Sequence, residues 1–123
     1  VEAAGAALRR VDDVGEVAAN AYSRPSKFRA GTSDKVWEAD IEKSTGRVRD
    51  PVTGRFMSKS KPWDMGHRPG YEFRKHQNSA AQRSISRQQF LDEHNDPTHY
   101  RPELPSSNRS HRGEGSYDFW NGS

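Results

Sequence analysis

The sequence predicts an α+β fold, in which a small hairpin and a further short strand pack on one short helix. Short apolar and aromatic segments separated by turn residues occupy residues 36–57 and predict strands. Segments with helix start and stop signals follow at residues 72–95 and 105–112. Strands and helices therefore fall largely in separate parts of the chain, which is typical of the α+β class.

Residues 1–34 are expected to form a helix and a linker outside the main domain. Apolar residues recur at helical spacing from Glu2 to Tyr22, and Ser, Pro and Gly residues between 23 and 33 indicate a linker. We place the main domain at residues 35–123. Because the chain begins at Val1 rather than Met, we expect the helix to connect this domain to a larger parent protein.

The first strands of the domain are predicted from alternation and turn chemistry. Residues 36–41 alternate roughly between apolar and polar side chains, which predicts a strand. Residues 47–49 and 55–57 flank residues 50–54, whose Pro and Gly content predicts a turn. These two flanking segments are expected to pair as a hairpin.

Two inserted helices are predicted between Glu72 and His94. The first runs from Glu72 to about Gln82, and the second starts at Ser86, where Ser86 and Gln89 form a capping-box pattern. The second should end near Asn95, because Pro97 disfavours helix in the residue before it.

The chain after the second inserted helix is predicted to be extended and then helical. Residues 98–101 should be extended, and Pro105, Ser106 and Ser107 supply N-cap chemistry for a short helix. Asn108 would then be among the first residues of that helix. The irregular tail should pack back through Tyr117, Phe119 and Trp120.

The composition predicts a thin core and a basic body. Only 30% of residues are hydrophobic and the mean hydropathy is −1.16, so aromatic rings must supply much of the core. Residues 1–20 hold two basic and four acidic side chains, which leaves 18 basic and 13 acidic side chains in the remainder. A basic body of this size suits a polyanion such as nucleic acid, although ordinary surface charge explains it equally well.

Several classes of protein are excluded by what the sequence lacks. There is no cysteine, which excludes disulfides, thiolate zinc sites and cysteine catalysis. No apolar run is long enough to span a membrane and nothing resembles a signal peptide, so no membrane partner is expected.

Two polar clusters predict a metal-dependent nuclease centre. Asn108, His111 and Glu114 recur three residues apart, so a helix would project them from one face towards one ion or phosphate. His67, with Asp64 close by, would form the second half of the site. An imidazole that titrates near neutral pH suits His67 as the base that activates water. A structural histidine that caps a carbonyl is the alternative for His67.

The remaining candidates concern the ion and the phosphates. Asn108 and His111 are the expected ligands of a divalent ion, Mg²⁺, Mn²⁺ or Zn²⁺, with a plain helix cap as the alternative for Asn108. Asp64 is either a third ligand or a supporting group, because residues three apart on a strand face opposite sides. The candidates for phosphate contacts are Arg101, Arg109 and Arg112, although each of them alone is more often a solvated surface charge. His99 is a further residue to test.

Residues 36–114 resemble the GH-E group of the HNH/endonuclease VII superfamily, nuclease domains at the C-terminus of bacterial polymorphic toxins. The resemblance rests on four segments: Trp63-Asp64-Met65-Gly66-His67, Pro69-Gly70-Tyr71-Glu72, the segment from Asn95 to Glu103, and Ser107 to Glu114. It implies a ββα-metal fold with the inserted helices, a catalytic role for His67, and a functional role for Glu114 as the family's glutamate.

The resemblance also implies a biological setting. The domain would act as a metal-dependent endonuclease on DNA in preference to RNA, and it would be neutralised by a cognate immunity protein. It would be secreted or delivered as part of a larger bacterial toxin and act in the cytoplasm of the target cell. Three alternatives stay open: an RNase toxin on the same fold, a nucleic-acid-binding module without catalysis, and a toxin fold reused as a protein-binding surface.

Overall fold

The computed structural model describes residues 21–115 and 120–122. The elements follow in the order α3 (Thr32–Ala39), β1 (Val48–Arg49), β2 (Phe56–Met57), β3 (Asp64–His67), α4 (Phe73–Arg83), α5 (Arg87–His94), a 3₁₀ turn (Pro97–His99), β4 (Tyr100–Glu103) and α6 (Pro105–Arg109). Most of the predicted helix from Glu2, and Tyr117 and Phe119 of the tail, lie outside the described residues. None of the described helices is long and apolar enough to cross a membrane.

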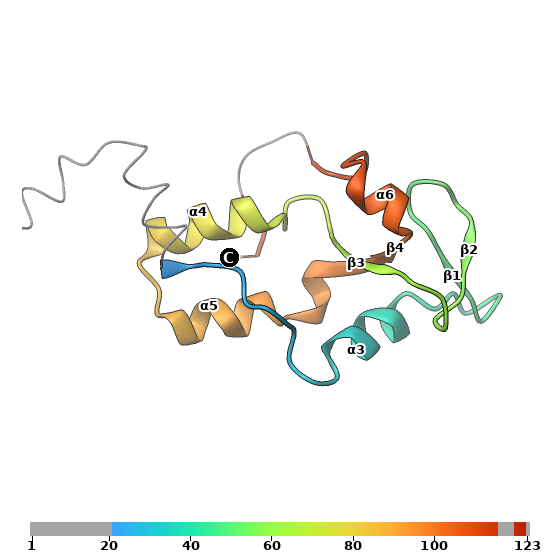
Figure 1. The fold of residues 1–123 in the computed structure, drawn as a ribbon, viewed down its shortest axis with the longest axis horizontal. Helices are drawn as coiled ribbons and strands as arrows, with labels where there is room; N and C mark the ends of the chain where they lie inside the picture. The colour runs from blue at the N-terminus through green and yellow to red at the C-terminus, as the bar shows by residue number, and fades with distance from the viewer. Residues whose placement is uncertain (1–20, 116–119, 123) are drawn as a thin grey trace, which may run out of the picture.

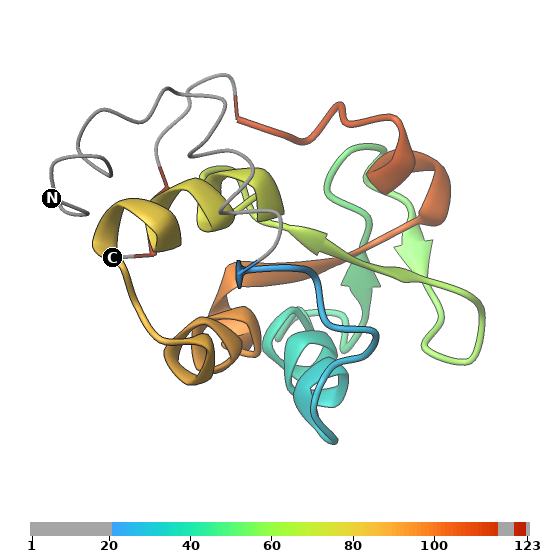
Figure 2. The ribbon, with the colours of Figure 1, turned by 60° about the vertical axis from the view of Figure 1, so that its left-hand side comes forward.

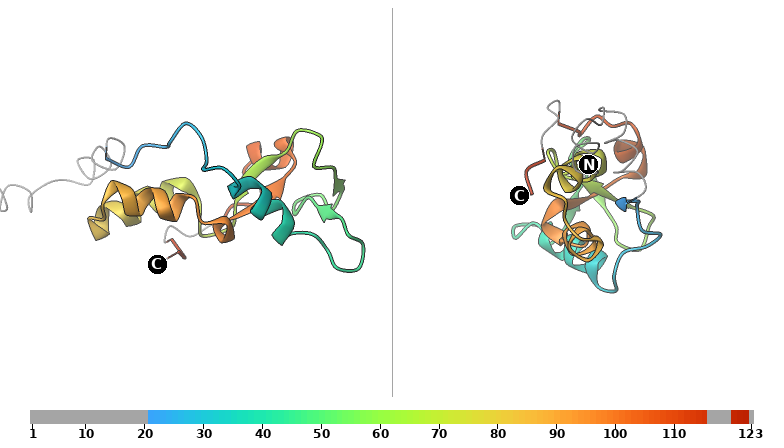
Figure 3. Two further views of the ribbon diagram at one scale, coloured as in Figure 1. Left: turned by 90° about the horizontal axis from the view of Figure 1, so that it is seen from below. Right: turned by 90° about the vertical axis from the view of Figure 1, so that its left-hand side faces the viewer.

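The molecule is elongated, with helices at one end and a hairpin at the other. Helices α4 and α5 lie side by side at one end, and β1, β2 and α6 lie at the other (Figures 1 and 3). Strands β3 and β4 run through the middle and join the two ends (Figure 2). Together these elements make a small α+β fold, as the sequence predicts.

The predicted hairpin is confirmed. Strands β1 and β2 pair antiparallel, with Val48 opposite Met57 and Arg49 opposite Phe56. Val48 and Met57 face inwards and form a core cluster with Trp37. Arg49 and Phe56 are exposed on the outer face. The hairpin therefore separates an apolar face from a polar one, as expected for strands with one buried side.

The predicted strand at residues 36–41 is wrong, because α3 covers most of it. Val36 and Trp37 are both buried, at 1% and 8% exposure. Neighbouring residues on a strand point to opposite faces, whereas on a helix both can face one core. Thr32 to Asp34, which the sequence analysis assigned to a linker, are residue types favoured in the first turn of a helix.

The two inserted helices are confirmed as α4 and α5, with the predicted cap at the start of α5. The Ser86 hydroxyl accepts a hydrogen bond from the Gln89 N–H at 3.1 Å, and α5 ends at His94, before Asn95. The second core cluster lies between these helices and includes Tyr22, Ala80 and Phe90. Tyr22 thus packs into the core, and α3 spans the boundary that was placed between residues 34 and 35. The division into two domains stays a prediction.

Strands β3 and β4 form the central antiparallel pair, which leads into α6. Gly66 lies opposite Arg101, and His67 lies opposite Tyr100. The predicted extended segment at residues 98–101 is correct only from Tyr100, because residues 97–99 form a 3₁₀ turn that Pro97 opens. Trp120, the described aromatic residue of the tail, is buried against His76 and packs back as predicted.

Candidate active site

A cavity of about 380 Å³ lies where β3, β4, α6 and the start of α4 meet. Its lining comprises Arg24, Met65, His67, Glu72, Phe73, Arg74, Glu103, Asn108, Arg109, His111, Gly113 and Glu114. The structure thus brings together the two clusters that the sequence analysis singled out, which lie about forty residues apart in the chain.

His67 ends β3 and lies in this lining. Burial, reinforced by the positive charge of Arg24, lowers the pKa of His67 to about 3. Its ring lies 4.8 Å from that of Tyr100. Nε2 of His67 is buried without a hydrogen-bond partner, a property that among the described residues only Nε1 of Trp120 shares. The imidazole is therefore neutral at physiological pH, the form that can accept a proton, and its Nε2 atom has no partner.

Gly66, the residue before His67, makes room for a buried carboxylate. A Cβ atom at Gly66 would overlap the carboxylate of Glu103 from β4. Glu103 is only 3% exposed, and burial raises its pKa. The Arg101 side chain pairs with Glu103 at 3.3 Å and also donates to the Gly113 carbonyl at 3.2 Å. Arg101 thus links the buried carboxylate to the loop after α6.

Asp64, at the start of β3, contacts the last residues of α6. Its Oδ2 accepts a hydrogen bond from the Asn108 amide at 3.0 Å. The Arg109 guanidinium donates to both carboxylate oxygens, at 3.3 and 3.4 Å. Asp64 does not belong to the lining itself, so the structure places it behind Asn108 and Arg109.

The predicted N-cap and single helical face of α6 are wrong. The N-cap is Leu104, whose side chain makes no capping hydrogen bond, and Ser107 lies inside the helix. Helix α6 ends at Arg109, and His111 has a left-handed backbone with φ of 61°. Asn108 is therefore near the end of the helix, and His111 and Glu114 follow it in a turn. Asn, Asp and His enter this conformation more readily than other non-glycine residues.

His111 and Glu114 nevertheless meet. Nδ1 of His111 lies 2.5 Å from a carboxylate oxygen of Glu114, and both side chains are exposed at the cavity. A carboxylate on Nδ1 fixes the imidazole ring and directs Nε2 away from the pair. Glu114 thus orients His111, and among the described residues it forms no hydrogen bond or ion pair with His67.

Buried Asp50 holds α6 against the β1–β2 turn. Its carboxylate accepts hydrogen bonds from the Leu104 N–H and the Ser107 hydroxyl, both at 2.8 Å, as well as from Thr53 of the turn. Burial alone would raise the pKa of Asp50, but these hydrogen bonds outweigh it and lower the pKa. Ser107, assigned from the sequence to a helix cap, therefore serves as an anchor for α6.

Glu72 closes the other side of the cavity. Its two carboxylate oxygens accept hydrogen bonds from the Gly70 and Gly115 N–H groups at 2.8 and 2.7 Å, and buried Lys75 pairs with it at 3.1 Å. Burial opposes ionisation of Glu72, but these contacts prevail and its pKa is lowered. Glu72 is thus an ionised group that ties the loop after α6 to the start of α4.

The remaining candidates lie away from the cavity lining. Arg112 is exposed and donates to the Ser110 hydroxyl at 3.4 Å. His99 is buried, stacks on Tyr71 with ring centroids 4.6 Å apart, and lies near Trp120. His99 therefore has a packing role in this structure.

The described residues do not hold a ready-made metal site. No three His, Asp or Glu side chains of residues 21–115 and 120–122 converge closely enough to hold an ion. The oxygen and nitrogen donors of the lining nevertheless fit a divalent cation, and Nε2 of His67 lacks a partner. Mg²⁺ in particular is commonly bound by one or two protein carboxylates together with substrate phosphates and water.

Sequence reasoning missed two carboxylates of the lining, Glu72 and Glu103. Both belong to segments that carry the family resemblance, but neither has a spacing that separates it from a surface glutamate. Pairing of β3 with β4 brings Glu103 beside Gly66, and only the register reveals this. The glycine before His67 was a usable signal, since an isolated glycine in a strand often marks a close approach.

Comparison with known protein families identifies a family of nucleases. Residues 45–114 match the model of the GH-E family, described as an HNH/ENDO VII superfamily nuclease with conserved GHE residues. No solved structure matches the chain. The match spans more than half of the chain and includes Gly66, His67 and all three glutamates of the cavity, Glu72, Glu103 and Glu114. The chain belongs to the GH-E family of HNH/endonuclease VII superfamily nucleases.

Proposed function

We propose that this domain is a metal-dependent endonuclease that hydrolyses phosphodiester bonds of DNA in preference to RNA. Membership of the nuclease family supports a nucleic-acid substrate. The observation that carries the proposal is His67, a neutral imidazole with an unpartnered ring nitrogen in a cavity lined by carboxylates and arginines.

His67 is proposed to accept the proton of the attacking water. The water oxygen bonds to phosphorus, the bond to the leaving sugar oxygen breaks, and the proton passes to the imidazole. A low pKa makes the free imidazole a weak base. The negative charge of a bound phosphodiester would raise that pKa and so strengthen the base when substrate is present.

The other residues of the site are proposed to hold an ion and the substrate. Asn108, His111 and Asp64 are the proposed holders of a divalent cation, Mg²⁺, Mn²⁺ or Zn²⁺, with Glu114 fixing the His111 ring. Bound there, the ion would stabilise negative charge on the phosphate and leaving oxygen. The proposed phosphate contacts are Arg101, Arg109 and Arg112.

The test is cleavage of plasmid DNA and of total RNA by the purified domain. Each substrate is incubated with Mg²⁺, Mn²⁺, Zn²⁺ or EDTA, with His67→Ala protein as the control for a contaminating nuclease. DNA cleavage that requires an added ion supports the proposal. Cleavage of RNA alone would show that the domain is an RNase. Cleavage in EDTA would show that the reaction needs no metal ion. If the domain bound nucleic acid but cleaved it under none of these conditions, it would be a nucleic-acid-binding module without catalysis.

We also propose that the domain is the toxic part of a delivered bacterial protein that acts in the cytoplasm of a target cell. Its producer would then need an immunity protein, and the arginines of the cavity, Arg24, Arg74 and Arg109, favour an acidic one. Because salt screens such charges, the association rate should drop steeply as ionic strength rises. Producing cells that tolerate the active domain without any neighbouring gene product would contradict the toxin role.

A further inference from the structure

Positive charge is concentrated on the β1–β2 hairpin and its flanks. Residues 43–61 contain six basic side chains and one acidic one, a balance of +5, whereas the whole chain has a net charge of +3. The rest of the chain therefore has a net charge of −2. The single carboxylate, Asp50, is buried and bonded internally, while all six basic residues are exposed: Lys43, Arg47, Arg49, Arg55, Lys59 and Lys61.

Two of these six side chains form ion pairs with carboxylates of the described residues. Arg49 pairs with Glu42 at 2.8 Å and Lys59 pairs with Asp34 at 2.9 Å. Within the described part of the chain, no ion pair joins the other four, Lys43, Arg47, Arg55 and Lys61, to a carboxylate. A single-sign patch of this kind attracts a polyanion.

The outer face of the hairpin holds two of these guanidinium groups in place. Arg49 lies opposite Phe56, and strand alternation puts Arg47 on the same face. The guanidinium carbons of Arg47 and Arg49 lie 3.9 and 4.0 Å from the centroid of the Phe56 ring. Phe56 is 36% exposed and, with Ile41, is one of two exposed large hydrophobic side chains among the described residues. Its ring serves as a platform for the two arginines.

The hairpin face is linked firmly to the cavity. Asp50, in the β1–β2 turn, bonds to Leu104 and Ser107 of the α6 segment. Val52 of the same turn lies beside Gly113 of the cavity lining. A polyanion held on the hairpin would therefore be held at a fixed position relative to the candidate active site.

We infer that the outer face of the β1–β2 hairpin, formed by Arg47, Arg49 and Phe56, together with exposed Arg55 directly after the turn and the flanking lysines, is a binding surface for the phosphate backbone of the nucleic-acid substrate. This rests on the proposed function and adds a surface outside the cavity. The arginines already cover the Phe56 ring, so the face fits phosphates and carries no base-stacking site. It should anchor the substrate without reading sequence.

The test measures binding of a fluorescent DNA duplex in the His67→Ala background, which prevents cleavage. Arg47→Glu and Arg55→Glu are compared with Lys27→Glu, which makes the same charge change on the loop where neighbouring Arg29 pairs with Asp92 of α5. Each hairpin variant should weaken binding about tenfold or more. It should also make the slope of log affinity against log salt concentration shallower by about one unit, the contribution of roughly one phosphate contact. Lys27→Glu should bind nearly as the parent does.

Two further measurements keep the inference testable. If Arg47→Glu disturbs the circular dichroism spectrum, Arg47→Gln removes the charge at the same exposed position and should also reduce the salt slope. Titration with polyglutamate tests an acidic protein as the occupant, and losses confined to polyglutamate would overturn the inference. The inference would also be overturned if the hairpin variants bound DNA as tightly as Lys27→Glu does. In that case, plasmid cleavage by the wild-type domain would still support the proposed function. Failure of the wild-type domain to bind or cleave would contradict the proposed function itself.

Discussion

Two histidines, half-buried His67 in the cavity lining and buried His76 on α4, have the same side chain but opposite surroundings. Burial lowers the pKa of both. Nε2 of His76 pairs with Glu93 at 2.9 Å, and its ring is stacked between Phe90 and Trp120. Nε2 of His67 has no partner.

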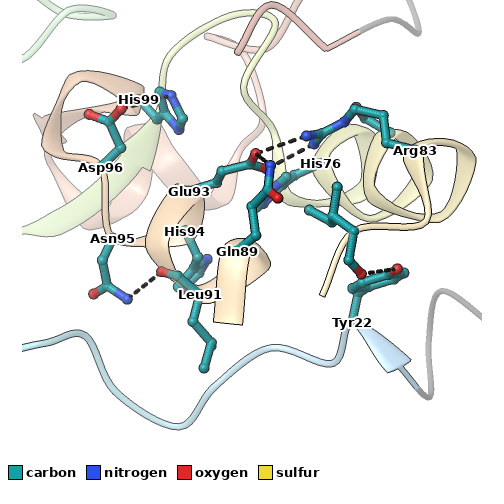
Figure 4. A network of polar contacts seen from close by, with 12 residues as sticks. Tyr22, His76, Arg83, Gln89, Leu91, Glu93, His94, Asn95, Asp96 and His99 are labelled. Carbon is teal, nitrogen blue, oxygen red and sulfur yellow. Dashed lines mark hydrogen bonds and ion pairs between the residues drawn. The ribbon is translucent and has the colours of Figure 1, made fainter. Parts of the chain in front are cut away.

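The surroundings of His76 form a closed network (Figure 4). The Arg83 guanidinium donates to both oxygens of Glu93 at 2.8 Å, and Gln89 donates to the same carboxylate at 3.2 Å. Burial alone would raise the pKa of Glu93, but these contacts lower it to about 2. A satisfied buried network stabilises a fold, whereas an unsatisfied buried group calls for another explanation, such as catalysis. The comparison therefore assigns His76 to stability and His67 to function.

The largest effect is expected from His67→Ala. Removal of a general base lowers cleavage by about two to four orders of magnitude. The thermal midpoint should fall less than in His76→Ala, because Nε2 of His67 makes no hydrogen bond and the substitution removes mainly the ring contact with Tyr100. Cleavage rates and unfolding curves measured on one preparation check both parts. Unchanged cleavage would remove His67 from the mechanism.

His76→Ala should have the converse result. It removes a ring stacked on two others and the Glu93 contact, so the free energy of unfolding should fall by about 2–4 kcal/mol. Cleavage per folded molecule should stay at the wild-type level at a temperature below the new transition. Urea titration gives the stability. A stable but inactive variant would contradict the division between the two regions.

Two carboxylates, buried Glu103 and half-buried Glu93, extend the comparison. Burial raises the pKa of Glu103 in the cavity, whereas the hydrogen bonds of Glu93 lower its pKa. Glu103 lines the cavity, and if its carboxylate supports the proposed ion, Glu103→Gln should reduce cleavage about 10- to 100-fold, the scale for groups that support a metal site. Glu93→Gln is the matched control and should lower the thermal midpoint while leaving cleavage intact. Equal cleavage by the two variants would show that Glu103 only fills space beside Gly66.

The sequence was sufficient where local signals decide the structure. The Ser86 cap, the 50–54 turn and the start of α4 are local features, and the structure has all three. The strand predicted at residues 36–41 was wrong because partial alternation also fits a helix that buries Val36 and Trp37 together. The local pattern of apolar residues cannot distinguish a strand from a helix when tertiary packing decides which face is buried.

The candidate site was predictable in its residues but not in its geometry. Five predicted residues line the cavity: His67, Asn108, Arg109, His111 and Glu114. Their arrangement depends on the left-handed turn at His111 and on the register of β3 with β4. Both arise from contacts between distant segments, such as Asp50 with Ser107 and Arg101 with Gly113. Spacing along the chain does not contain that information.

The smallest effect concerns stability against pH. Burial lowers the pKa of His67 to about 3 and that of His94 to about 4, whereas histidines in the unfolded chain titrate near 6.5. As the pH falls below 6.5, the unfolded chain therefore binds protons that the native protein does not. The free energy of unfolding is greatest above pH 6.5 and decreases as the pH falls towards 4 and then 3.

Replacement of His67 should remove part of this dependence. One histidine kept neutral contributes at most about 2 kcal/mol of destabilisation between pH 6.5 and 5, so His67→Gln should flatten the stability profile by about 1–2 kcal/mol over that interval. His76→Gln should flatten it less, because the Glu93 carboxylate partly offsets the effect of burial on the pKa of His76. Urea titrations at pH 7, 6 and 5 in EDTA measure the free energy of unfolding of the wild type and of each variant. The slope of this free energy against pH is then compared among the three proteins. If the His67→Gln and wild-type slopes coincide, His67 already ionises in the native protein. The distinction between an unsatisfied and a satisfied histidine would then fail.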